Sequence, residues 1–347
     1  MALGLVSPAQ GAERFYLEVD SFAHSEPVPI RAYFNDWRGD SRHGGDTALS
    51  YNWWEAGMED GPWRLGVLYR YDYTLRFSSD TAELYHRIQN KSPLPPGRRY
   101  ALAITVQHYA VRGLRLAHGW RPRGGLEIQW GLSYLQGRRV LDGNLSGWAE
   151  AVSDKDYDFR FEVDDVYSRD PLFKRRVSAP EGEGYSVDLA LNWLAAPWEL
   201  RFKVVDLIGA LYWKAVPHTR ATGTSDTKRL DESGYVRFDP ALSGIEDRRD
   251  QVQRLRPRTK VDVRYALNRR HRAALALLAT RWQRFVRAGW VVGTPRAGQW
   301  QVLYDVSARA LALSHESPRW RWSVIADDVR AHYARTFGIS AQYVWRW

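Results

Sequence analysis

The stretch that decides the fold runs from residue 63 to residue 77 and reads WRLGVLYRYDYTLRF. Starting at its first residue, every second side chain is apolar or aromatic. The positions between them include the charged residues Arg64, Arg70, Asp72 and Arg76. Successive side chains point to opposite faces of a β-strand, so the segment predicts a strand with one apolar and one charged face. At about 3.3 Å per residue it is ~50 Å long, longer than most strands of soluble domains.

The same alternation recurs at 126–134, 157–164, 185–193, 198–204 and 260–267. No apolar run approaches the ~20 residues that a membrane-spanning helix needs. Yet the 347 residues include 17 Trp, 19 Tyr and 11 Phe, and so much aromatic surface needs an apolar surrounding. A soluble antiparallel sandwich with one solvated face and a membrane barrel both fit the alternation.

Composition excludes several classes of function. The chain contains no Cys, which rules out a disulfide scaffold, thiolate catalysis and Cys-ligated zinc, and suits an oxidising compartment. The net charge is +10, but the Arg residues are scattered among acids, and no basic helix or tail marks a nucleic-acid partner. No cofactor or metal site is expected.

Two features favour a membrane barrel over a soluble sandwich. First, tryptophans lie beside predicted turns, where transmembrane barrels carry aromatic girdles; they are Trp53, Trp54, Trp63, Trp120, Trp193, Trp198, Trp213, Trp320 and Trp322. Second, the chain ends in a strand-like alternation at full aromatic strength, whereas the termini of soluble domains usually fray.

This C-terminal stretch resembles the assembly signal of bacterial outer-membrane β-barrels, a terminal strand of alternating apolar residues that closes on an aromatic residue. The matching residues are Phe337, Ile339, Tyr343, Trp345 and Trp347. The family usually ends in Phe, so Trp347 is a departure, and the subfamily is not identified. The resemblance implies an all-β, transmembrane antiparallel up-and-down β-barrel in the cell outer membrane. It also implies outer-membrane lipid and the barrel assembly machinery as partners.

Counting alternating segments predicts about 14 strands, with 12 and 16 as alternatives. The predicted strands are 13–23, 46–57, 62–77, 99–121, 125–136, 139–152, 157–167, 184–194, 198–216, 256–268, 271–293, 298–314, 319–327 and 335–347. Residues 13–347 then form a single barrel domain, and the first twelve residues, MALGLVSPAQGA, have the composition of a signal-peptide remnant. Strand parity places the long loops 24–45, 78–98, 168–183 and 217–255 on the outer side.

Charged residues on the inward parity are the candidate pore-lining groups. They are Arg64, Arg70, Asp72, Arg76, Arg160, Glu162, Arg201, Lys203 and Arg264. An inward arginine cluster can select anions. Alternatively, these cations pair with acids of the same face and stabilise a narrow interior. The sequence leaves both roles open.

The leading function is a porin-like outer-membrane channel for passive diffusion of small polar or anionic solutes. A second hypothesis is a non-conducting barrel that anchors or docks another envelope component, a surface or periplasmic protein bound through loop 217–255. A third is a barrel-embedded lipid hydrolase, but no HExxH or GxSxG motif occurs. We therefore expect no enzymatic activity and no catalytic residues.

Overall fold

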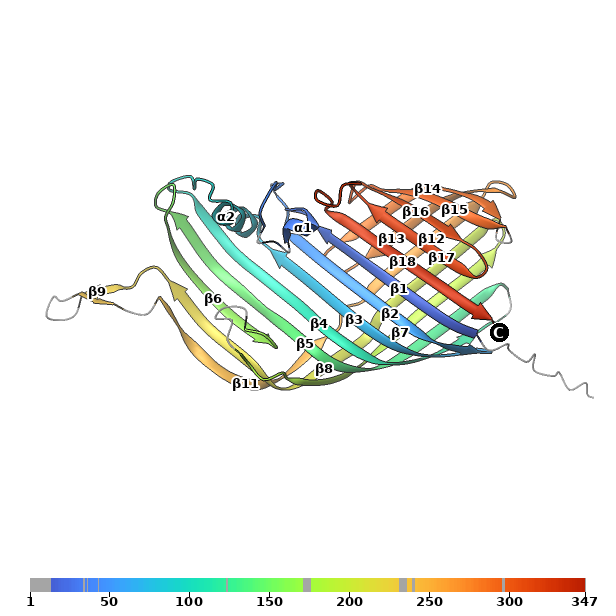
Figure 1. The fold of residues 1–347 in the computed structure, drawn as a ribbon, viewed down its shortest axis with the longest axis horizontal. Coiled ribbons are helices and arrows are strands. Elements are labelled where there is room, and N and C mark those ends of the chain that lie inside the picture. The colour runs from blue at the N-terminus through green and yellow to red at the C-terminus, as the bar shows by residue number, and fades with distance from the viewer. Residues whose placement is uncertain are drawn as a thin grey trace, which may run out of the picture.

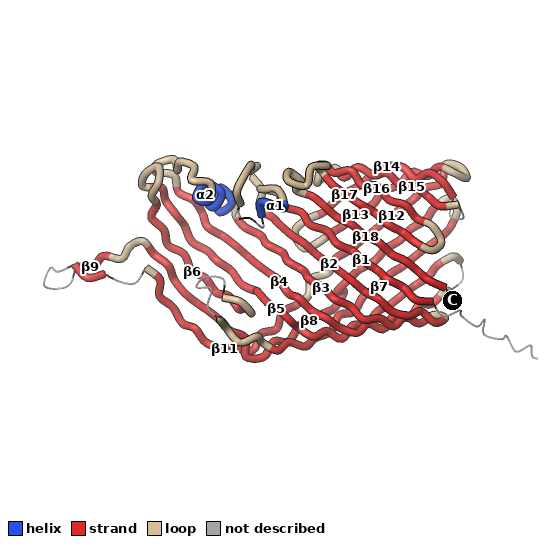
Figure 2. The backbone as a smooth tube through the Cα atoms, viewed as in Figure 1, coloured by secondary structure: helices blue, strands red, loops and turns tan. Residues whose placement is uncertain are grey.

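The computed structural model describes residues 14–346 except residues 34, 36, 43, 123, 171–175, 231–235, 239–240 and 295–296. Figures 1 and 2 show an elongated barrel of tilted strands. The strands are β1 (Arg14–Ser25), β2 (Thr47–Asp60), β3 (Trp63–Phe77), β4 (Arg99–Trp120), β5 (Leu126–Ala151), β6 (Tyr157–Tyr167), β7 (Glu181–Ala195), β8 (Trp198–Thr224), β9 (Lys228–Leu230), β10 (Val236–Phe238), β11 (Leu242–Arg254), β12 (Arg258–Ala266), β13 (His271–Ala279), β14 (Arg284–Thr294), β15 (Gly298–Asp305), β16 (Ala310–Glu316), β17 (Trp320–Ala326) and β18 (Thr336–Arg346); the helices are α1 (Ile30–Tyr33) and α2 (Ser79–Gln89).

The sheet closes because β18 pairs with both β17 and β1. Two of its descending strands are interrupted. β6 and β7 lie end to end between β5 and β8, and β11 and β12 lie end to end along the other edge of β8. The 16-stranded sheet therefore occupies 14 positions around the barrel. This confirms the predicted all-β, antiparallel, 14-stranded barrel.

The strand boundaries differ from the prediction in four places. The predicted strands 125–136 and 139–152 are one strand, β5, with a bulge where Ala110 faces Arg139 and Val111 faces Gly137. The bulge shifts the side-chain parity, which in sequence has the appearance of a break. The predicted strand 271–293 is the hairpin β13–β14, and 298–314 is the hairpin β15–β16. The interrupted strand β6–β7 was counted as two.

Above the closed ring, one side of the wall rises further. β6 and β11 belong to this part, together with the outer ends of β3, β4, β5 and β8, and we call it the wall extension (left in Figure 1). The predicted loop 217–255 is wrong over most of its length, because 217–224 continue β8 and 242–254 form β11. Its role in binding a partner stays a prediction. The predicted signal-peptide remnant 1–12 and Trp347 of the predicted assembly signal lie outside the described residues.

Two of the predicted outer loops contain helices. α1 lies in the predicted loop 24–45, and α2 lies in the predicted loop 78–98. The hydroxyl of Ser78 accepts a hydrogen bond from the backbone N–H of Thr81 and caps the N-terminus of α2. Neither helix of the described chain is long and apolar enough to cross a membrane.

The outward parity of the barrel is an apolar belt. On β3, Leu65 and Val67 are 58% and 59% exposed, whereas Arg64 and Arg70 on the other parity are buried. The belt continues around the ring through Phe15, Leu17, Trp54, Leu114, Leu116, Leu132, Tyr134, Leu275, Val286, Trp290, Val302, Leu311, Val324, Phe337, Ile339, Tyr343 and Trp345. Large side chains exposed in this arrangement need lipid around them. The chain is therefore an outer-membrane barrel. With the long connections 26–46 and 78–98 facing outward, both described ends lie on the periplasmic side.

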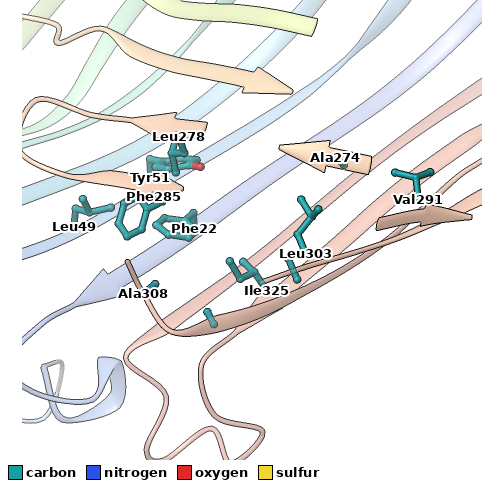
Figure 3. Close-up of a cluster of buried hydrophobic side chains, with 12 residues drawn as sticks. Phe22, Leu49, Tyr51, Ala274, Leu278, Phe285, Val291, Leu303, Ala308 and Ile325 are labelled. Atoms are coloured by element: carbon teal, nitrogen blue, oxygen red, sulfur yellow. The ribbon is translucent and has the colours of Figure 1, made fainter. Parts of the chain in front are cut away.

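Packed side chains, instead of a wide aqueous bore, fill much of the interior. Figure 3 shows one cluster, in which Phe22 of β1 lies beside Tyr51 of β2 and Phe285 of β14. The ring centroids of Phe22 and Phe285 are 5.0 Å apart. Their strands are not neighbours in the sheet, so the contact crosses the lumen.

Candidate functional site

Ion pairs that join distant strands cross the lumen at mid-height. We call this group the ion-pair layer; its members are Glu18, Asp20, Arg70, Asp72, Lys203, Asp206, Arg258 and Lys260. All eight side chains belong to the inward parity or, for Asp206, to a bend in β8. Each cation of the layer contacts at least one acid from another strand.

Arg70 is the most completely enclosed cation of the layer, with no exposed side-chain surface. Its Nη1 and Nη2 atoms lie 2.8 and 2.6 Å from the two carboxylate oxygens of Asp206. Nη2 also donates to Asp72 at 3.0 Å and to the hydroxyl of Tyr109 at 2.7 Å. This bidentate arrangement satisfies both Nη atoms of a buried guanidinium, whereas Arg70 Nε has no hydrogen-bond partner among the described residues.

The backbone of β8 bends to aim Asp206 at Arg70. Asp206 has φ +59°, an uncommon conformation for a non-glycine residue. The register between β7 and β8 shifts at this point, between Val187 and Leu189. Asp206 also accepts a hydrogen bond from Ser186 Oγ at 2.6 Å. The strained bend thus has a structural purpose, because it supplies the counter-charge of a buried arginine.

Other pairs connect opposite walls of the barrel. Lys260 of β12 contacts Asp20 of β1, and these strands are seven positions apart in either direction around the ring of 14. Lys203 of β8 reaches Glu18 of β1, with 3.2 Å between Nζ and Oε1. Since two side chains span the gap between opposite walls, the lumen is flattened and occupied at this level.

Cavities lie in the lumen on both sides of the ion-pair layer. On the outer side is a narrow cavity of about 50 Å³, lined by Tyr51, Tyr109, Arg256, Arg281 and Trp282 among others. On the periplasmic side is a wider, polar cavity of about 530 Å³. Its charged lining residues are Glu127, Glu199, Arg201, Glu316 and Arg321.

Charge is balanced differently in the two cavities. In the periplasmic cavity, Arg201 makes a bidentate contact with Glu316 at 2.9 and 3.0 Å, and Glu316 also contacts Arg321. At the outer cavity, neither Arg256 nor Arg281 has a carboxylate within ion-pair distance among the described residues. Burial and the neighbouring Arg281 lower the pKa of Arg256. Asp142 is near enough to act electrostatically on both arginines but forms no ion pair with either, so the two arginines leave the outer mouth of the lumen with net positive charge.

The structure brings six of the nine predicted pore-lining residues into the lumen. These are Arg64, Arg70, Asp72, Arg201, Lys203 and Arg264. Arg76 lies at the outer rim, half exposed and 3.8 Å from Asp46. Arg160 and Glu162 lie on β6 in the wall extension, exposed and away from the closed ring.

The lumen arginines are paired instead of lining a free path. Arg64 contacts Glu18 at 2.8 Å and covers the ring of Tyr16. Arg264 lies 2.9 Å from Asp262 and 3.2 Å from Glu316. Of the two roles that the sequence left open for these residues, pairing describes this conformation.

The sequence-based search missed most of the acids in the layer. Glu18 and Asp20 alternate with Phe15, Leu17 and Val19, so their inward parity was available as a signal. Arg258 and Lys260 begin β12 on the same parity as Arg264. Asp206 gave no such signal, because it depends on the bend in β8.

No protein-family model matches the sequence, and no curated protein matches it. Among solved structures, the TodX deltaS2S3 mutant monoaromatic hydrocarbon channel has a TM-score of 0.43 at 9% identity, over 98% of this chain and 91% of that chain. The P. putida toluene transporter TodX has a TM-score of 0.39 at 11% identity, over 98% and 91%. The outer-membrane protease OmpT from Escherichia coli has 0.30 at 8%, over 99% of each chain.

All three similar structures share little more with this chain than a barrel of tilted strands, and TM-scores this low carry no inference about function. The class of the protein rests on its own geometry instead. A closed ring of 14 antiparallel positions, an apolar belt outside and a charged interior together define a transmembrane β-barrel of the outer membrane.

Proposed function

We propose that the chain is a gated outer-membrane channel for small polar solutes, with a preference for anions. The ion-pair layer is the gate, and the conformation described here is closed. The observation that carries the proposal is the position of the layer, between one lumen cavity that faces outward and another that faces the periplasm. An open, passive porin does not fit this conformation, because cross-lumen pairs occupy the bore.

The preference for anions comes from the outer mouth. Arg256 and Arg281 are exposed there and form no ion pair among the described residues, and Asp142 is the acid that acts on both from nearby. Unpaired arginines at the entrance of a low-dielectric passage raise the local concentration of anions. The interior charges beyond them are balanced, so selection by charge acts at the mouth.

Conductance in planar bilayers tests the gate. The double variant Lys203→Ala/Lys260→Ala removes the two lysines that reach β1 across the lumen. We expect a low conductance for the wild type and an increase of about tenfold or more for the double variant, since two ion pairs that cross the lumen to β1 are lost. Arg76→Ala, at the exposed rim, is the matched control and leaves conductance unchanged.

Ion selectivity tests the mouth. In a KCl gradient, the double variant that opens the gate is expected to have a reversal potential that favours chloride. Adding Arg256→Gln and Arg281→Gln is expected to abolish that preference. If a folded double variant still passes no current, the alternative of a non-conducting anchor barrel replaces this proposal.

A further inference from the structure

A further cavity lies outside the lumen, on the outer face of the wall extension. It has a volume of about 480 Å³, which falls in the range of small-molecule sites. Its floor comes from β3, β4, β5 and β6, and its cover comes from α1, the segment after it and α2. Figure 1 shows both helices at the outer ends of the strands.

Strand register places this cavity on the same face as the lipid belt. Tyr73, Leu75 and Phe77 of β3 have the parity of the lipid-facing Val67. Leu75 pairs with Val106 of β4, and Val106 pairs with Gly143 of β5. The cavity therefore lies outside the barrel wall, directly above the belt, and it is separate from the proposed solute path.

Aromatic rings dominate the cavity; they belong to Tyr33, Trp37, Tyr73, Phe77 and Tyr85, and we call them the aromatic cage. Trp37 is central, with ring centroids 5.4 Å from Phe77, 5.3 Å from Tyr85 and 5.9 Å from Tyr33. The rings of Trp37 and Tyr85 are nearly perpendicular, at 88°. Ring faces arranged at such angles can surround a cation, because each face carries negative potential.

One carboxylate joins the cage. Asp165 of β6 lines the cavity and is only 8% exposed. Gly143 leaves the room that this carboxylate occupies, since a Cβ there would lie 1.9 Å from Asp165 Oδ1. Within the described chain, the carboxylate of Asp165 accepts no hydrogen bond, and no Lys or Arg lines the cavity.

A buried carboxylate without a neighbouring cation is unfavourable, and the pKa of Asp165 reflects this cost. Burial and the neighbouring acids Asp164 and Asp142 raise the pKa of Asp165 to about 7, while His218 opposes the rise. Tyr73 of the cage also faces it. A ligand that brings positive charge would relieve this cost.

We infer that the aromatic cage and Asp165 bind an organic cation with an apolar body, such as a quaternary ammonium group. The five rings supply cation–π contacts and Asp165 supplies the counter-charge. The shared chemistry is the ammonium group, whether a free solute or a lipid headgroup of the outer leaflet brings it.

Binding to the purified protein in uncharged maltoside micelles tests this inference, with Trp fluorescence or calorimetry as the readout. Choline is the probe, and its uncharged tert-butyl isostere is the comparison. We expect choline to bind and the isostere to bind at least about tenfold more weakly. Affinity for choline should rise about tenfold from pH 6 to pH 8 as Asp165 ionises.

Two variants and a control assign the site. Asp165→Asn is expected to lose choline binding and its pH dependence. Tyr85→Leu keeps an apolar side chain, removes one ring, and should weaken choline but not the isostere. Glu162→Gln changes an exposed carboxylate of the same strand and should have no effect.

A competition experiment distinguishes the two sources of the ammonium group. In it, dodecylphosphocholine, a lipid-like ligand, competes with choline at a concentration below its critical micellar concentration. Tighter binding of dodecylphosphocholine indicates a lipid headgroup as the source, and tighter binding of choline indicates a free solute; both results support the inference. Equal binding of choline and its isostere, or unchanged choline binding by a folded Asp165→Asn variant, would overturn it. The measurement is equilibrium binding at a site outside the lumen. Its result is therefore independent of whether the barrel conducts ions.

Discussion

At the scale of single residues, the interior depends on matched partners. Arg70 has four polar contacts from Asp206, Asp72 and Tyr109, and both carboxylates are at least nine-tenths buried in the barrel. Such a pair contributes less to stability than its removal costs, since a lone buried charge is very unfavourable.

Replacing Arg70 with Met should therefore destabilise the barrel by about 3–5 kcal/mol, because Asp206 and Asp72 keep their charge without Arg70. Arg76→Met, at the half-exposed rim, should change stability by less than about 0.5 kcal/mol. Reversible unfolding in guanidinium, followed by Trp fluorescence, measures both. Similar midpoints for the two variants would contradict the role given to Arg70.

Trp213 depends on two facing glycines. It is 1% exposed, and its ring lies where the Cβ atoms of the paired residues Gly137 and Gly182 would be, 2.3 and 2.4 Å from the nearest ring carbons. Gly182→Ala should cost about 1–3 kcal/mol through overpacking. Gly119→Ala, whose added Cβ would meet its nearest atom at 3.7 Å, should be nearly neutral in the same unfolding assay.

At the scale of elements, the alternation of apolar and polar residues predicted the strands but misplaced several of their boundaries. β3 was predicted almost to the residue, because its alternation has no interruption. β5 appeared as two strands because the bulge at Arg138 reverses parity. The hairpins β13–β14 and β15–β16 each appeared as one strand, since their turns contain little Gly or Pro. Two merged hairpins and two split strands cancel, so the total of 14 was right while the divisions were not.

The candidate site was predictable only in part, for the same kind of reason. Parity places Arg64, Arg70 and Lys203 inward, but only the curvature of the closed sheet decides which opposite strand each one meets. The aromatic cage was out of reach, because Trp37 and Tyr85 come from segments predicted as loops. Apolar residues at helical spacing, Leu84 and Ile88, were the available signal for α2.

β6 is the element whose stability should depend on pH. The pKa of Asp165 is raised from 3.8 to about 7, so the folded state favours the protonated carboxyl. Its stabilising contribution is complete below about pH 4 and is lost as pH rises through 7. Hydrogen exchange at β6, corrected for intrinsic rates, should speed up between pH 5 and pH 8.

The variant Asp165→Asn should remove this dependence while leaving the exchange of β15, within the closed ring, unaffected. His218 lies between Asp247 at 2.7 Å and Asp164 at 3.0 Å and also holds β6 to its neighbours. The difference between the wild type and the variant therefore isolates the contribution of Asp165. An unchanged pH profile in the variant would rule out Asp165 as the source.

At the scale of the whole molecule, the belt makes the outward face intolerant of charge. Leu132 is 48% exposed and is flanked by Leu116 and Val187 on neighbouring strands. Leu132→Arg should destabilise the inserted barrel by about 2–4 kcal/mol if it lies near the bilayer midplane. Val329→Arg, on a fully exposed outer turn, should be tolerated.

Refolding into lipid vesicles, followed by the gel-mobility difference between heated and unheated samples, measures the folded fraction of each variant. Equal folding yields for the Leu132 and Val329 variants would contradict the position of the belt.

The continuous apolar parity of β3 has a consequence for how the barrel sits in its bilayer. The same row of side chains runs from Trp63 in the belt to Phe77 of the aromatic cage. The sequence of β3 therefore does not define the outer boundary of the lipid-facing surface. The cover formed by α1, Trp37 and α2 sets that limit. Without the cover, the hydrophobic height would be greater on this side of the barrel than on the other, and the mismatch would be relieved by tilt or by local thickening of the outer leaflet.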